Sequence, residues 1–248
     1  MQFESKGVYK IKLGYNIRLN MIKEVPFLID RSNKGLLLNS QQLNTITYLL
    51  EQLELYHMPT LNHSLNVAEF SMRLAMELGL EEKYVETVFI GGLLHDIGKL
   101  TIPLHLLNRK NNSILSDMEY RLLRNHGAEG ARIIRMAGLP EILALFANQH
   151  SIGMNRHTKD PDLIRSQHWL NPIIAVSDTV CSSLDATRTY QDKMKIVEVF
   201  SSLSRKSAEG RVPKALLDAT GTIMCQMYPE LAKPGLSQVK WIGMNGKQ

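Results

Sequence analysis

Histidine and aspartate side chains in widely separated segments place the strongest constraint on what this chain can fold into. The adjacent pair His95-Asp96 stands at the centre of the set, at the start of the run His95-Asp96-Ile97-Gly98-Lys99. Neutral imidazoles and carboxylates bind Fe, Mn and similar divalent transition ions, and a carboxylate can lie between two of them. We therefore expect a fold that gathers these segments around one or two ions. The candidate ligands are His63, His95, Asp96, His126, His150 and Asp178.

The composition is that of an ordinary globular protein and argues against several classes. The apolar stretch around 88–94 is too short to span a bilayer, and no secretory signal is visible at the N-terminus. We therefore expect a cytoplasmic protein without membrane contact, in which Cys181 and Cys225 are free thiols. The net charge of +5 comes without a dense Lys/Arg stripe and interleaved aromatics, so no nucleic-acid polymer is expected as a partner.

The periodicity of apolar residues changes at about residue 40. Residues 8–20 alternate apolar and polar side chains, which is typical of half-buried strands, so 1–40 is predicted to be a small N-terminal β-rich segment. From Ser40 onward the apolar residues recur at helical spacing, and 41–248 is predicted to be a helical domain. The expected fold class is mainly α, a helical bundle that holds the metal between its helices.

Local signals predict details of the helices that carry the candidate ligands. His63 is expected to begin a helix, and the capping box formed by Ser116 and Glu119 is expected to open the helix that carries His126. The pair Gly91-Gly92 costs about 1 kcal/mol per residue inside a helix. That cost predicts close packing of the pair against another helix near the metal centre.

The run Leu94-His95-Asp96-Ile97-Gly98-Lys99 resembles the signature of the HD superfamily of metal-dependent phosphohydrolases. Over about residues 56–225, the segments 125–131, 149–150 and 175–178 further resemble its HD-GYP branch. The resemblance implies an HD-type helical bundle with a binuclear metal centre. It implies that one ion is held by His63, His95, Asp96 and Asp178, and a second ion by Asp96, His126 and His150.

The chain departs from the pattern of the branch at two places. Gln149 stands where the branch has the first histidine of a His-His pair, and the Gly-Tyr-Pro motif is absent after His150. The resemblance therefore leaves activity on cyclic di-GMP, the usual substrate of the branch, unsupported. Lys99 resembles the signature lysine that pairs with a substrate phosphate, and Arg188 lies one residue from the position of a phosphate-contacting arginine. Asp96 and Lys99 are the expected catalytic residues, and Lys99, Gln149 and Arg188 the expected substrate-binding residues.

These observations favour a phosphohydrolase or phosphodiesterase that cleaves a nucleotide or cyclic dinucleotide through a metal-bound hydroxide. Its partner would be a small phosphoester molecule, while a homodimer or a signalling partner stays open. The main alternative is an HD domain with weak or no turnover that serves as a nucleotide-binding or protein-interaction module, because Gln149 and the lost motif depart from the pattern. An HD enzyme acting on mononucleotides and a structural scaffold without metal are further alternatives.

Overall fold

The computed structural model describes residues 38–109, 115–151, 168–184 and 192–228. The described part is helical and contains no strand, which confirms the mainly α prediction for it. The β-rich segment predicted for 1–40 lies outside the described residues except for its last three, of which Ser40 begins the first described helix. The elements are α2 (Ser40–Glu77), α3 (Glu82–Leu94), the 3-10 helix η1 (Ile97–Thr101), α4 (Leu104–Leu107), α5 (Asp117–Arg124), α6 (His126–Met136), α7 (Glu141–Gln149), α9 (Asn171–Leu184), α10 (Asp192–Ala208) and α11 (Lys214–Met227).

Helix α3 lies close to three other helices because two of its residues have no side chain. A methyl group on Gly92 would lie 2.6 Å from the Cα of Ala68 in α2. A methyl group on Gly91 would collide with the ring of Phe146 in α7 and lie 2.6 Å from Cδ1 of Ile174 in α9. The close packing predicted from the glycine pair is therefore confirmed, and it brings together helices that carry candidate ligands.

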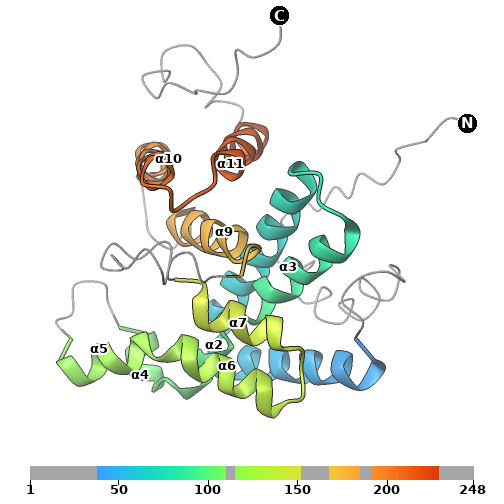
Figure 1. Ribbon diagram of the computed structural model, residues 1–248. Coiled ribbons are helices and arrows are strands. Elements are labelled where there is room, and N and C mark those ends of the chain that lie inside the picture. The colour runs from blue at the N-terminus through green and yellow to red at the C-terminus, as the bar shows by residue number, and fades with distance from the viewer. Residues whose placement is uncertain (1–37, 110–114, 152–167, 185–191, 229–248) are drawn as a thin grey trace, which may run out of the picture.

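The hydrophobic core runs through α2, α3, α6, α7 and α9, and buried residues of α10 and α11 extend it. Helix α10 lies beside α9, and α11 lies beside α10 and α2, at one end of the molecule; α5 extends away beside α6 at the other (Figure 1). The core includes the completely buried side chains of Ile46, Leu50, Leu74, Ile90, Leu93, Ile134, Phe146 and Ile174. The same interior also buries polar side chains, and His95, Asp96 and His150 are among them. Burying ionisable groups is costly unless they are paired or bind a metal, so this cluster requires an explanation.

Two predicted helix starts differ from the structure. The residue His63 lies inside α2 rather than at a helix start, because the new helical direction begins at a kink at His57 (φ −155°, ψ 87°). The capping box of Ser116 and Glu119 is present as predicted, but it opens α5, which ends before His126. A new helix, α6, begins at His126, whose Nδ1 lies 2.5 Å from the carbonyl oxygen of Leu123 at the end of α5. The ring therefore donates a hydrogen bond to the last turn of α5, where the direction of the chain changes.

None of the described helices combines the length and the hydrophobicity that a membrane span needs. Both cysteines are free, as predicted: Cys181 is buried in α9 and Cys225 is partly buried in α11. Burial raises the pKa of both thiols, so neither is poised as a nucleophile at neutral pH.

Candidate metal centre

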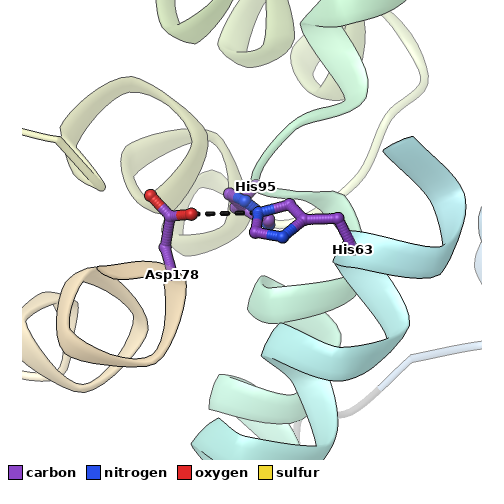
Figure 2. Close-up of side chains that lie close together, drawn as sticks. All are labelled: His63, His95 and Asp178. Atoms are coloured by element: carbon purple, nitrogen blue, oxygen red, sulfur yellow. Dashed lines mark hydrogen bonds and ion pairs between the residues drawn. The ribbon is translucent and has the colours of Figure 1, made fainter. Parts of the chain in front are cut away.

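All six candidate ligands meet in two groups at the centre of the bundle. In each group the ligand atoms lie within 4.8 Å of one another. Figure 2 shows the first group, in which side chains from α2, the end of α3 and α9 point toward one another. The second group is formed by the residue after His95 and by residues of α6 and the end of α7. The first group is His63, His95 and Asp178, and the second is Asp96, His126 and His150.

Asp96 lies between the two groups with one carboxylate oxygen toward each. Its Oδ2 is 3.3 Å from Nε2 of His95 and 3.7 Å from Nε2 of His63. Its Oδ1 is 3.3 Å from Nε2 of His126 and 4.0 Å from Nε2 of His150. This is the arrangement that a carboxylate bridging two ions requires, and it agrees with the division of ligands that the resemblance implies.

The hydrogen bonds of three histidine rings leave their Nε2 atoms as ligand atoms. In each ring Nδ1 lies near the backbone carbonyl three residues earlier, at 2.8 Å for His95, 2.5 Å for His126 and 2.7 Å for His150. A carbonyl only accepts, so Nδ1 carries the hydrogen in each ring and Nε2 keeps its lone pair. Metal-binding histidines are held in the same way, through the nitrogen that faces away from the ion.

The surroundings of these Nε2 atoms show whether a metal fits the site. Nε2 of His95 is buried and has no hydrogen-bond partner. In addition, Nε2 of His126 and Nε2 of His150 are only 3.2 Å apart, although both are assigned lone pairs. Buried polar atoms are rarely left without a partner, and facing lone pairs repel each other. Divalent ions bound by these nitrogens, one in each group, would satisfy them, so the residues present fit a metal.

Both carboxylates of the centre are held in their ionised form. Burial alone would raise the pKa of Asp96, but the ammonium of Lys99, 2.6 Å from Oδ2, and the neighbouring ring of His95 hold it well below its usual range. Loss of surrounding water would likewise raise the pKa of Asp178, but the hydrogen bond from Nε2 of His63, at 2.9 Å, holds it below its usual range. Both side chains therefore present negative oxygens to the centre at neutral pH.

The imidazoles respond to burial in two ways. Burial lowers the pKa of His150 to about 4, so its ring is neutral at pH 7. Burial also acts to lower the pKa of His95, but the negative charge of the adjacent Asp96 raises it above its ordinary value. A neutral ring is the form that binds a metal.

Gly98 sets the position of the His95-Asp96 turn against the helix that carries His126. The turn connects α3 to η1, and the completely buried Ile97 anchors it in the core. A methyl group on Gly98 would collide with the backbone oxygen of His126 and lie 2.5 Å from the backbone nitrogen of Gly130. The turn can therefore rest on the backbone of α6 only because residue 98 is glycine.

The predicted substrate-binding residues have different outcomes. Lys99 lies at the centre, in an ion pair with Asp96. The side-chain oxygen of Gln149 accepts a hydrogen bond from the backbone N–H of His168 at 3.2 Å, so it links α7 to the segment before α9. Arg188 lies outside the described residues, and its role stays a prediction.

Several curated proteins resemble this chain. A 3'3'-cGAMP-specific phosphodiesterase 1 from Vibrio cholerae is 28% identical over 160 residues, which are 64% of this chain and 36% of that protein. A cyclic di-GMP phosphodiesterase from Thermotoga maritima is 28% identical over 214 residues, 82% of this chain and 56% of that protein. The chain thus spans from about a third to just over half of the length of these two relatives.

Solved structures and a family model agree with the observed fold. The HD domain of the phosphodiesterase PgpH from L. monocytogenes, solved with cyclic-di-AMP, superposes with a TM-score of 0.56 at 20% sequence identity. The match covers 73% of this chain and 97% of that domain, and at this identity it supports the fold alone. The family model described as HD domain matches residues 60–187, more than half of the chain and a range that contains all six candidate ligands. The chain therefore belongs to the HD domain family.

Proposed function

We propose that this chain is a metal-dependent phosphodiesterase that hydrolyses a phosphoester bond in a cyclic dinucleotide. The observation that carries the proposal is the position of Asp96, which directs one oxygen to each of two groups of metal-ligand side chains. Two ions held in this way provide the centre that phosphoester hydrolysis uses. The names of the relatives from Vibrio cholerae and Thermotoga maritima support a cyclic dinucleotide as the substrate class.

The proposed centre divides its tasks among the side chains of the chain. The ions would be Fe, Mn or similar divalent transition ions, which accept mixed imidazole and carboxylate ligands. When bound, they would supply a Lewis acid and lower the pKa of a water molecule. His63, His95 and Asp178 would hold one ion, His126 and His150 the other, and Asp96 would contribute to both.

Lys99 is the residue we assign to the substrate phosphate. Its side chain is 27% exposed, whereas that of its partner Asp96 is 3% exposed. The ammonium therefore lies at the open edge of the buried centre, where it can donate hydrogen bonds to a phosphate oxygen. A lysine at this place also balances the charge of the buried carboxylate before substrate arrives.

Hydrolysis of a panel of substrates by wild-type protein and two variants tests the proposal. The panel contains 3'3'-cGAMP, cyclic di-GMP, cyclic di-AMP and a phosphomonoester nucleotide, each with Mn²⁺ or Fe²⁺, and the metal content is measured by elemental mass spectrometry. We expect Asp96→Asn to lose bound metal and to hydrolyse substrate at least about 100-fold more slowly. Loss of a group that only orients a ligand costs up to about 100-fold, and Asp96 is itself a candidate ligand. The control Asp218→Asn changes an exposed aspartate in α11 and should keep both.

A second candidate function is nucleotide binding without turnover. Gln149 favours it, because residue 149 offers an amide in place of an imidazole, its oxygen accepts a hydrogen bond from the backbone of His168, and the second ligand group consists of two histidines and Asp96. Wild-type protein that holds metal and binds a cyclic dinucleotide but hydrolyses nothing in the panel would replace the first proposal with this one. Hydrolysis of the phosphomonoester alone would instead move the substrate class to mononucleotides.

A further inference from the structure

Asp178 receives a hydrogen bond from a serine one helical turn later on α9. The hydroxyl of Ser182 donates to Oδ1 of Asp178 at 3.0 Å. The same oxygen lies 2.9 Å from Nε2 of His63, so it is the atom that faces the first ligand group. Figure 2 shows this carboxylate directed from α9 toward the histidines of α2 and α3.

The other hydroxyl groups of α9 behave differently. In this helix, which lies wholly in the described part of the chain, the hydroxyls of Ser177, Thr179 and Ser183 each donate to the backbone carbonyl four residues earlier. That bond is the usual one for serine and threonine inside a helix. Ser182 instead bonds the side chain four residues earlier. Its hydroxyl is therefore committed to the candidate ligand.

Asp178 needs such support more than Asp96 does. The side chain of Asp96 is 3% exposed and is surrounded by His63, His95 and Lys99, whereas that of Asp178 is 26% exposed. Packing restricts the rotation of a side chain less when one side faces water. A hydrogen bond to an ionised carboxylate is stronger than one between neutral groups, and it restricts the rotation of the carboxylate.

We infer that Ser182 is a positioning residue for the metal centre. It holds Oδ1 of Asp178 toward His63 and His95, so that the ion of the first group finds its carboxylate ligand already oriented. The inference rests on the metal centre of the proposed function. Removing groups that orient a metal ligand costs about 10- to 100-fold in metal affinity, and we place Ser182 at the lower end because one hydrogen bond is lost.

Metal binding by three variants tests this role with matched chemistry. The affinity of each protein for Mn²⁺ is measured by competition with a fluorescent chelator, and the geometry by the visible absorption of bound Co²⁺. We expect Ser182→Ala to lower the affinity for one Mn²⁺ ion, the one held by the first group, about 10-fold. The variant should also change the Co²⁺ spectrum. Ser182→Thr keeps the hydroxyl and should restore both. Ser183→Ala removes a neighbouring hydroxyl that bonds only to a backbone carbonyl and should match wild type.

The outcomes separate this inference from the proposal beneath it. Wild-type protein that binds ions, together with Ser182→Ala that matches Ser183→Ala in affinity and spectrum, would overturn the role of Ser182 and leave the metal centre standing. Wild-type protein that takes up no Mn²⁺ or Co²⁺ would overturn the proposed function and this inference together. Equal losses in Ser182→Ala and Ser182→Thr would also overturn the role of the hydroxyl, because they would point to packing alone.

Discussion

Gly98 lies so close to the backbone of the helix that carries His126 that a methyl group at residue 98 would collide with it. Side chains can move aside when a new methyl group arrives, but two backbones in contact cannot do so without shifting a whole element. The shift would separate the Asp96 turn from His126, whose facing atoms are now 3.3 Å apart. At the residue scale, the distance between Asp96 and His126 therefore depends on residue 98 being a glycine, which has no Cβ to separate the two backbones.

We predict that Gly98→Ala lowers the free energy of unfolding by about 3 kcal/mol, the upper end of the range for overpacked cores, and weakens Mn²⁺ binding. The control is Gly130→Ala in the same contact, where the methyl group would come no closer than 3.2 Å to Ala147 Cβ or Gly98 N. That change should cost less than about 1 kcal/mol, since alanine also favours the helix by a similar amount. Urea unfolding compares the two, and equal stability of Gly98→Ala and wild type would contradict the prediction.

At the scale of the element, the kink in α2 determines how His63 is presented. His57 leaves the helical conformation, and its Nδ1 accepts a hydrogen bond from the backbone N–H of Thr60 at 3.2 Å. This is the position and the bond of a helix N-cap, here made by an imidazole. Because Nδ1 accepts, Nε2 carries the hydrogen and donates to Oδ1 of Asn108 at 3.3 Å. The kink thus joins the helix of His63 to the segment that follows η1.

The cap at His57 makes the stability of the protein sensitive to pH. Burial lowers the pKa of His57 and the charge of Lys99 acts in the same direction, while the hydrogen bond to Asn108 opposes them. A lowered pKa means that the unfolded chain binds the proton more readily. The contribution is therefore present above the ordinary pKa of about 6.5 and is lost as the pH falls through the lowered value. Protonation also removes the acceptor that caps the helix.

We predict that His57→Ala lowers the free energy of unfolding at pH 7.5 by about 1 kcal/mol, as for other lost N-caps. His57→Asn should lose less, because its oxygen can accept the same bond without titrating. Between pH 7.5 and pH 5, wild type should lose more stability in urea unfolding than His57→Asn does. Parallel losses in the two proteins would show that His57 does not titrate in this range or does not cap the helix.

At the scale of the whole molecule, the candidate ligands come from five parts of the bundle, namely α2, the turn from α3 to η1, α6, α7 and α9. Ions that bind these residues favour the folded chain over the unfolded chain, in which the segments are far apart. Metal binding and tertiary structure are therefore coupled across the molecule.

We predict that Mn²⁺ at about 100 times its dissociation constant stabilises the wild-type protein by about 2.7 kcal/mol for each site, and that a chelator reverses the gain. Thermal unfolding with and without EDTA measures the shift. Asp96→Asn should gain much less than Asp218→Asn, which keeps every candidate ligand. A variant lacking Asp96 that gained as much as wild type would show that the ions bind elsewhere on the surface.

Much of the helical architecture and all six members of the cluster could be predicted, because periodicity, capping and ligand chemistry are properties of short segments. The capping box at Ser116 and the close contact of Gly91-Gly92 are examples. The kink at His57 and the position of Gln149 could not, since each depends on a partner from a distant segment, Asn108 in one case and His168 in the other. The β-rich segment predicted for 1–40 lies almost wholly outside the described residues and stays a prediction.

The sequence by itself determined that this is a helical chain with imidazoles and carboxylates suited to a divalent transition ion, because those properties belong to residue types and their spacing. Only the tertiary structure decided how they are arranged. It directs the two oxygens of Asp96 to different groups of histidines, leaves Nε2 of His95 buried without a hydrogen-bond partner, and turns Ser182 toward Asp178. These relations arise from the packing of helices that are distant in the chain, and local sequence does not specify that packing.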